Sequence, residues 1–397
     1  MFQNTLEKRF FNPAQGHRLE VMIPMDRIDD TPTIQTNGEI MPLIISEETP
    51  PPGYERLIFA EDTSNGLQAY ICLHSTVCGP AAGGCRMWAY DSREAAREDV
   101  LRLARGMTAK NVMAGLGLGG GKSVIIGNAR EDKTPAMLRA FGRAIDTLEG
   151  RYYTAEDVGF SPEDIRIVAE ETEFAVGLEG GEHGSGDPSP FTAEGVFQCL
   201  KVGASDAFGS DDLTGRRVLV QGLGHVGMSL ADKLHAAGAS LIVSDINQAE
   251  LGQARDRLRA DICPVDQVFD TQMDIFAPCA LGGILTHETA QKLSARLVCG
   301  AANNQLAEDS VAEVLSARGI RYLPDYVVNA GGIISVASEI HKAGEAYRQA
   351  RLEEIAIRIA EILETSKRTG QSSTRVADQI VGDILDRACD HRQEGAA

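Results

Sequence analysis

The sequence predicts an α/β protein of two domains, one built on a mixed sheet and one on a doubly wound parallel sheet. Three observations support this prediction. The 397 residues exceed the usual size of a single domain. Within 54–174, strand-like runs such as 68–73 alternate with helix-like runs such as 92–105. After residue 190, short apolar runs alternate regularly with helix-forming stretches, which is typical of a parallel sheet.

The expected boundaries divide the chain into an extension and two domains. Residues 1–52 are expected to be an irregular N-terminal extension, because they end in a Glu-Glu-Thr-Pro-Pro-Pro stretch that cannot continue a helix or an inner strand. Residues 53–177 are assigned to the first domain and residues 178–371 to the second, with a loop at 180–190 near the junction. The C-terminal helices at 372–397 are candidates to pack back on the first domain.

The second domain has the more regular pattern. Its expected strands cover residues 218–221, 241–244, 274–277, 297–300 and 321–323. Beyond about Ile334 the chain is expected to be helical to its end, because apolar residues recur at helical spacing. These residues are Leu352, Ile355, Ile359 and Leu363.

Composition argues against several classes of function. A formal net charge of -19 and a pI near 4.9 disfavour nucleic acid as a partner. The chain has no run of about 18 apolar residues and no signal-peptide pattern, so we expect a cytoplasmic protein with no membrane partner. The eight cysteines form no CxxC pair and lie among apolar residues, which predicts reduced core thiols and no metal site.

The first chemical motif is a glycine-rich turn between an apolar run and a helix-like stretch. It reads Gly222-Leu-Gly224-His225-Val226-Gly227. Gly222 allows a tight turn, Gly224 lets the backbone approach a pyrophosphate, and Gly227 lets the helix pack on the strand. Asp245 ends the next strand, where a carboxylate binds the adenosine ribose and repels a 2′-phosphate. The motif predicts a Rossmann-type domain that binds NAD rather than NADP, and the alternative is a structural turn that binds nothing.

Two lysines stand in a second glycine-rich region. Lys110 ends the segment 106–110, and Lys122 follows three glycines and precedes the apolar run 124–126. Burial would penalise the ammonium form of Lys122, which makes it a candidate general base. One alternative is that both lysines are exposed. A phosphate-binding loop is a second alternative, but it fails because Leu116 stands where that pattern needs its first glycine.

Acids and amides occur where other strands are expected to end. Asp157 follows a short strand that begins at Tyr152, and it is a candidate proton shuttle, although an N-cap or turn role is equally ordinary. Segments 299–305 and 325–333 place amides and glycines just past two further strands. Doubly wound folds bind their ligands at the carboxyl ends of strands.

Six segments together resemble those of a known family. They cover residues 79–88, 106–110, 119–122, 154–159, 184–190 and 324–332. In this order they resemble the Glu/Leu/Phe/Val dehydrogenases, most closely the leucine dehydrogenases, from about Tyr54 to the late helical region. The resemblance implies an NAD-dependent amino acid dehydrogenase whose two domains close around the substrate.

The resemblance implies roles for individual residues. Lys122 would activate water for attack on an imino intermediate, and Asp157 would carry protons to and from the amine. Lys110 would bind the substrate α-carboxylate. It would be assisted by Asn304 and by the backbone of Gly83 and Gly84. Thr192 would lie near the nicotinamide carboxamide, while hydride passes from the substrate Cα to nicotinamide C4.

The resemblance also bears on the substrate. Ala82 stands where the family's glutamate dehydrogenases carry a lysine for the second carboxylate, so glutamate is disfavoured. Leucine dehydrogenases usually have leucine there, so Ala82 enlarges the pocket that Ala155, Ile333 and Val336 would complete. We therefore expect a homo-oligomer that converts an apolar, leucine-like or valine-like L-amino acid to the 2-oxo acid and ammonia. An aromatic amino acid dehydrogenase and a non-catalytic nucleotide sensor are the alternatives.

Overall fold

The computed structural model describes residues 5–12, 17–24, 34–36, 39–41, 43–178 and 187–396, with side chains described for 43–178 and 187–392. The chain forms two compact units. The first comprises Met1–His74, Gly84–Ala104 and Gly121–Ala175, and the second comprises Ser75–Gly83, Arg105–Gly120 and Val176–Ala397. The two-domain α/β fold is thereby confirmed. The domain boundaries expected from the sequence stay a prediction, and most of the expected loop at 180–190 lies outside the described residues.

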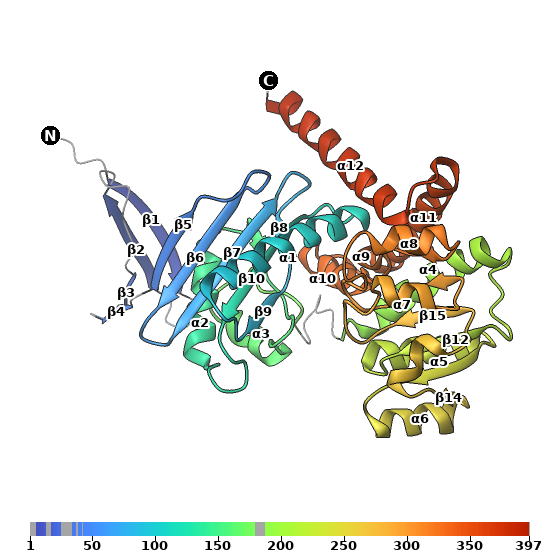
Figure 1. Cartoon of the computed structure of the whole chain (residues 1–397). Helices are drawn as coiled ribbons and strands as arrows, with labels where there is room; N and C mark the ends of the chain where they lie inside the picture. The colour runs from blue at the N-terminus through green and yellow to red at the C-terminus, as the bar shows by residue number, and fades with distance from the viewer. Residues whose placement is uncertain are drawn as a thin grey trace. The chain divides into compact units, whose positions relative to one another are not determined.

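A seven-stranded mixed sheet organises the N-terminal part of the chain. Its order is β11-β8-β10-β7-β6-β5, and β9 also pairs with β10. β5, β6 and β7 are antiparallel neighbours that lie side by side in Figure 1, whereas β8 and β9 run parallel to β10. The strands are β5 Leu43–Glu48, β6 Arg56–Asp62, β7 Leu67–Ser75, β8 Ala81–Ala82, β9 Cys85–Trp88, β10 Gly119–Ile126 and β11 Tyr152–Tyr153.

The described part of the N-terminal extension contains strands, so the prediction that it is irregular is wrong. β1 (Thr5–Asn12) pairs antiparallel with β2 (His17–Pro24), and β3 (Ile34–Thr36) pairs with β4 (Glu39–Met41). β5 is the edge strand of the large sheet and pairs with β6. The proline stretch after β5 marks the end of a strand, because proline cannot donate the next hydrogen bond of the ladder.

The three helices of this region begin at recognisable signals. They are α1 (Arg93–Met113), α2 (Pro135–Asp146) and α3 (Pro162–Val168). The Thr134 side chain accepts a hydrogen bond from the Met137 backbone N–H at the start of α2. Ser161 and Asp164 form a capping box at the start of α3, which satisfies backbone donors that the helix itself cannot. α1 contributes apolar residues to a core cluster that includes Leu57, Phe59, Tyr70, Cys72, Ala96, Val100, Ala104 and Val124.

Glycines at the start of β10 allow backbone and side chains to pack closely against the strand. A Cβ atom at Gly120 would lie 2.0 Å from the Thr108 backbone nitrogen in α1. A Cβ atom at Gly121 would lie 2.9 Å from the Tyr152 ring. Both positions need glycine for internal packing, a reason that the sequence pattern did not reveal.

A six-stranded parallel sheet organises the second unit. Its order is β14-β13-β12-β15-β16-β17, which is the doubly wound order in which two halves diverge from a central pair. Each of its neighbouring pairs is parallel. Val218, Leu219 and Val220 are fully buried, as expected for a strand covered on both faces. The strands are β12 Arg217–Gln221, β13 Ser240–Ser244, β14 Asp261–Ile262, β15 Ile275–Pro278, β16 Leu297–Val298 and β17 Arg321–Tyr322.

Helices account for most of the remaining second unit. They are α4 Ser189–Phe208, α5 His225–Ala236, α6 Gln248–Leu258, α7 His287–Lys292, α8 Val311–Ala317, α9 Asp325–Val328, α10 Gly331–Ile340, α11 Glu345–Thr369 and α12 Ser373–Ala396, with a 3₁₀ turn at Val265–Asp270. The expected C-terminal helical region is confirmed (Figure 1). The apolar stripe of α11 is buried at Leu352, Ile355, Ile359, Ile362 and Leu363. In the described part of the chain, no helix has the length and apolarity needed to cross a bilayer.

Candidate active site

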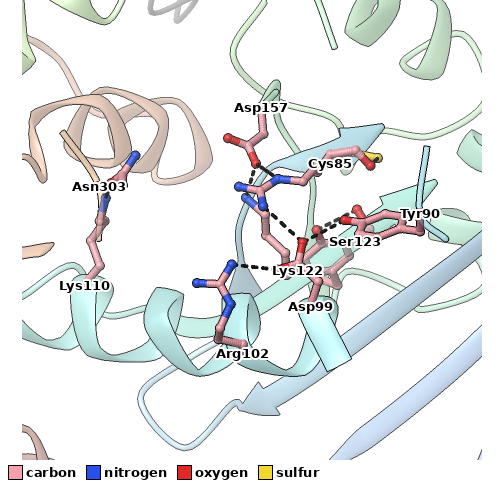
Figure 2. Close-up of polar contacts among 11 residues, drawn as sticks. Cys85, Tyr90, Asp99, Arg102, Lys110, Lys122, Ser123, Asp157 and Asn303 are labelled. Atoms are coloured by element: carbon pink, nitrogen blue, oxygen red, sulfur yellow. Dashed lines mark hydrogen bonds and ion pairs between the residues drawn. The ribbon is translucent and has the colours of Figure 1, made fainter. Parts of the chain in front are cut away.

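A buried lysine and a carboxylate form the centre of the site in the first unit. Lys122 lies within β10, and only 6% of its side chain is exposed. Its Nζ lies 2.9 Å from Oδ2 of Asp157, and the two side chains point toward each other in Figure 2. Two residues from separate motifs are thus brought together. The alternative that Lys122 is exposed does not hold.

Asp157 reaches this position because the chain after β11 runs close to the strand β9. A Cβ atom at Gly84 would lie 2.3 Å from the Glu156 carbonyl oxygen, so only glycine allows this approach. The Cys85 backbone N–H donates to the Ala155 carbonyl at 2.8 Å. Asp157 is not an N-cap, since Ser161 caps the next helix.

Two cations determine the charge of Asp157. Its Oδ2 atom lies 2.9 Å from Lys122 Nζ and 3.4 Å from Arg86 Nε. Burial raises the pKa of the Asp157 carboxyl, but the charges of Lys122 and Arg86 outweigh burial, and the pKa is lowered. Asp157 is therefore ionised at neutral pH and able to accept a proton.

Arg86 belongs to a network of polar and charged side chains that the sequence analysis did not identify. Its Nη1 donates to Asp99 Oδ2 at 3.0 Å, and the Tyr90 hydroxyl donates to the same oxygen at 2.7 Å. Arg102 Nη2 donates to Asp99 Oδ1 at 2.6 Å. The strand that carries Arg86 ends at Trp88, the only tryptophan of the sequence, and this residue is 55% exposed. A charged residue between the apolar Cys85 and Met87 was the available signal.

Lys110 lies in a second cluster of polar side chains, within the second unit. Its Nζ donates to Asn303 Oδ1 at 3.1 Å, and these two side chains also point toward each other (Figure 2). Asn329 Nδ2 donates to the same Asn303 oxygen at 2.8 Å. Asn303 is thus one partner of Lys110. The neighbouring Asn304 has a φ of 51° and accepts at its carbonyl from the Gly283 N–H, and its contact with a substrate stays a prediction.

Thr192, expected near the nicotinamide, lies in the first turn of α4, and Ile333 and Val336, expected near the substrate side chain, lie on α10. A Cβ atom at Gly331 would lie 2.3 Å from the Phe191 carbonyl oxygen, so the two helix starts are in close contact. Thr192 lies at this contact and donates to the Pro188 carbonyl at 3.1 Å. Ile333 and Val336 are half-buried, and their spacing of three places them on one face of α10.

The alanines and glycines expected to line the substrate site are largely buried. Ala82 is fully buried in β8, and its carbonyl accepts from Asn111 Nδ2 at 3.1 Å. Ala155 is 7% exposed, and Gly83 is buried beside half-buried Gly84. Their contact with a substrate stays a prediction.

The glycine-rich turn in the second unit has the geometry of a dinucleotide-binding loop. Gly222 has a φ of 96°, a left-handed conformation that favours glycine, and a Cβ atom at Gly227 would lie 1.9 Å from the Gly222 carbonyl oxygen. A Cβ atom at Gly224 would meet no atom within 4 Å, so open space lies beside the loop. His225 and Val226 are the first residues of α5, whose N-terminal N–H groups favour a phosphate.

An open cavity of about 740 Å³ adjoins this loop. Its lining includes Leu223, Gly224, His225, Met228, Ser229, Asp232, Asp245, Ile246, Asn247, Glu250 and Gln253. Asp245 Oδ2 accepts from the Leu223 N–H at 2.5 Å, and its Oδ1 accepts from the Asn247 N–H at 2.7 Å. The residues therefore fit an adenosine dinucleotide.

Comparison with known families identifies this combination of sites. Residues 55–174 match the model described as "Glu/Leu/Phe/Val dehydrogenase, dimerisation domain", and residues 245–382 match "Glutamate/Leucine/Phenylalanine/Valine dehydrogenase". The chain belongs to the Glu/Leu/Phe/Val dehydrogenase family. It is therefore an amino acid dehydrogenase of an NAD(P)-dependent family of oxidoreductases.

Individual members of the family are similar over most of their length. The leucine dehydrogenase of Bacillus cereus is 48% identical over 327 residues, which cover 82% of this chain and 89% of the relative. The phenylalanine dehydrogenase of Caldalkalibacillus thermarum is 41% identical, covering 84% and 92%. The crystal structure of L-tryptophan dehydrogenase from Nostoc punctiforme superposes with a TM-score of 0.75 at 37% identity, covering 85% of this chain and 97% of that one.

Proposed function

We propose that the protein catalyses the NAD-dependent oxidative deamination of an apolar L-amino acid to the 2-oxo acid and ammonia, and the reverse reductive amination. The observation that carries the proposal is the buried pair of Lys122 and Asp157, 2.9 Å apart. A buried amine beside an ionised carboxylate can pass a proton between nitrogen and oxygen, which deamination requires at two steps. A sensor without chemistry would have no need for this pair.

Each polar group has a distinct task in the proposed mechanism. Asp157 accepts a proton from the substrate amine, and Lys122 accepts a proton from the water that attacks the imine carbon. Lys110, held by Asn303, pairs with the substrate α-carboxylate. Bound NAD supplies the acceptor for the hydride that leaves the substrate Cα.

NAD is the proposed cofactor on the basis of the cavity beside Gly224. Three carboxylates, those of Asp232, Asp245 and Glu250, line this cavity. A 2′-phosphate would bring at least one further negative charge next to them, which costs free energy in a partly buried site. NADP is therefore the disfavoured cofactor.

An apolar amino acid is the proposed substrate because the residues assigned to the pocket are apolar. Ile333, Val336, Ala82 and Ala155 carry no charge that could compensate a second carboxylate. Relatives named leucine dehydrogenase at 45–48% identity favour a branched aliphatic side chain. An aromatic substrate is the second candidate, favoured by the small Ala82 and by similarity to phenylalanine and tryptophan dehydrogenases.

The test is a panel of L-amino acids, with NADH formation followed by absorbance. We expect leucine, valine and isoleucine to be oxidised with higher kcat/KM than phenylalanine and tryptophan, and glutamate to be inactive. Lys122→Ala and Asp157→Asn should each lower kcat by about two to four orders of magnitude, the usual worth of acid-base catalysis, with little change in NAD affinity.

Two outcomes would contradict the proposal. Tight NAD binding without turnover of any amino acid would favour the nucleotide sensor. Near-full kcat in Lys122→Ala would refute the role of the lysine. We also propose that the protein is a homo-oligomer and is located in the cytoplasm. Sedimentation of the purified protein as a monomer would contradict the proposed oligomer.

A further inference from the structure

Among the described residues, Arg86 is the cation that contacts Asp157 beside Lys122 and that has no task in the proposed mechanism. Its guanidinium bridges two carboxylates, with Nε 3.4 Å from Asp157 Oδ2 and Nη1 3.0 Å from Asp99 Oδ2. The Arg86 side chain is 21% exposed and the Asp99 side chain is 16% exposed, so water screens these contacts only in part. A planar guanidinium with two anchored sides has a fixed orientation.

Asp99 has the contacts needed to hold Arg86 still. Its Oδ2 accepts from both Arg86 and the Tyr90 hydroxyl, and its Oδ1 accepts from Arg102. Burial raises the pKa of Asp99, but these hydrogen bonds and the Arg86 charge outweigh it, and the pKa is lowered. Burial and the neighbouring Asp99 raise the pKa of Tyr90, so the phenol keeps its proton and donates it. Asp99 is thus an ionised anchor on α1, opposite Asp157 (Figure 2).

Lys122 and Arg86 are the charged partners that act on Asp157 from the elements packed around it. β10 contributes Lys122, β9 contributes Arg86 and Cys85, and β11 contributes Tyr152. Burial raises the pKa of Cys85 to about 12 and also raises the pKa of Tyr152, so both are neutral at physiological pH. If Lys122 gains or loses a proton during the reaction, Arg86 is the cation that remains.

We propose that Arg86, anchored by Asp99, is a positioning residue that keeps the Asp157 carboxylate ionised and aimed while the charge of Lys122 changes during turnover. The inference rests on the proposed function, because it assumes that Asp157 carries protons. Arg86 touches Asp157 and acts through it. Arginine suits this task because its guanidinium stays protonated throughout the working pH range.

The sign of the expected pH effect follows from the charge that is removed. Arg86→Gln takes a cation away from Asp157, so the pKa of Asp157 rises and its carboxylate is protonated at higher pH. Every proton-binding group near the lost charge holds its proton more tightly, so the acid-side limb of kcat/KM moves to higher pH. We expect a move of about one pH unit and a loss in kcat of up to about 100-fold, the cost of a misplaced reacting group.

Arg86→Lys separates charge from orientation. Lysine keeps the positive charge, so the limb should stay near its original pH, but it has no planar fork with which to hold both carboxylates, so kcat should still fall. Asp99→Asn should lower kcat in the same direction as Arg86→Gln. Because Asp99 acts through Arg86, the variant that combines Asp99→Asn with Arg86→Gln should lose no more kcat than Arg86→Gln alone.

The control is Arg139→Gln, which removes an arginine of the same unit from an exposed pair with Glu170 at 2.8 Å. It should leave kcat and the pH limb unchanged. Equal losses in Arg86→Gln and Arg86→Lys with an unmoved limb would overturn the proposal and leave Arg86 a purely structural role. If Arg86→Gln does not fold, the kcat of Asp99→Asn decides, because this variant keeps both cations and removes only the anchor of Arg86. A lowered kcat supports the positioning role, and an unchanged kcat overturns it.

The assay distinguishes failure of the inference from failure of the proposed function. Full activity of Asp157→Asn would remove the proton-carrying role itself. An inactive Asp157→Asn together with a normal pH profile in the Arg86 variants would overturn only the role of Arg86.

Discussion

Asp245 is a residue whose two carboxylate oxygens already serve the loop before any cofactor binds. They accept backbone N–H groups of Leu223 and Asn247, which holds the strand end against the glycine-rich turn. The same carboxylate lines the cavity next to Asp232 and Glu250. Asp245 therefore has a structural task in addition to the discrimination against a 2′-phosphate that we propose for it.

Asp245→Ala should narrow the preference for NAD over NADP. The variant loses the charge that repels a phosphate and the acceptor for the ribose. The ratio of kcat/KM with NAD to kcat/KM with NADP should therefore fall, by a factor equivalent to about 1.5 to 3 kcal/mol, the free energy of a charged hydrogen bond. Steady-state kinetics with both cofactors measure the ratio. Asp256→Ala, which removes an exposed carboxylate paired with Arg255 on α6, is the control and should leave the ratio unchanged. Equal use of both cofactors by the parent enzyme would contradict the assignment.

The sequence predicted which residues form the candidate site better than it predicted the contacts between them. Lys122 and Asp157 were expected from glycine density and a strand end, and the structure brings them together. Lys110 donates to Asn303, a residue that the sequence analysis did not name, and the expected role of Asn304 at the substrate α-carboxylate stays a prediction. Adjacent asparagines are indistinguishable by pattern, because the choice depends on the backbone, here a left-handed φ of 51° at Asn304. Asp99 was missed because Arg86 and Tyr90 lie outside α1, on β9 and just after it, and no local pattern pairs a helix residue with them.

The start of β10 shows how an element depends on the absence of side chains. Gly120 packs against the backbone of α1 at Thr108, and the clash that a Cβ atom would cause is with backbone and not with a flexible side chain. The helix and the strand that carry Lys110 and Lys122 therefore approach each other more closely than alanine would allow.

Gly120→Ala should destabilise the protein by about 3 kcal/mol or more, because overpacking against backbone forces the helix to shift. Gly106→Ala is the matched control. Gly106 lies in α1, the helix against which Gly120 packs, and no atom lies within 4 Å of the added Cβ. Gly106→Ala should stabilise the protein by about 0.5 to 1 kcal/mol through helix propensity. Denaturant unfolding of both variants measures the difference, and similar stabilities for the two would refute the packing argument.

Helices and strands were predictable where the pattern of apolar residues within the segment itself specifies them. The five strands expected in the second unit are present, although β16 covers only Leu297–Val298. The expected helix at 92–105 extends to Met113 as α1, and its continuation packs at Thr108 against Gly120 of β10. The strands before residue 52 were missed because β5 is specified by pairing with β6, a partner that no local pattern reveals.

The whole molecule carries a net charge of -19, and its charge bears on cofactor binding. Among the described residues that line the cavity at Gly224, the ionised side chains are acidic and none is lysine or arginine. We therefore expect the attraction for the pyrophosphate of the proposed cofactor to come from backbone N–H groups at the start of α5, while the acidic side chains of the cavity repel it.

The KM for NAD should fall as ionic strength is raised from about 10 mM to about 150 mM, because the screening length shrinks from about 30 Å to about 8 Å and the repulsion weakens. Initial rates at saturating amino acid give the KM. An inert osmolyte at matched osmolality controls for solvent effects. A KM that rises with salt would show that basic side chains bind the phosphates.

Trp88 gives this protein a built-in optical reporter. It is the single tryptophan of the chain, it ends the strand that carries Arg86, and the residue is 55% exposed. Fluorescence excited selectively at the indole therefore comes from the first unit alone, while the dinucleotide-binding unit contributes no tryptophan signal. Comparing this emission with circular dichroism during unfolding separates the melting of the first unit from that of the whole chain. The local environment of β9 in each Arg86 variant can be followed in the same way without any added label.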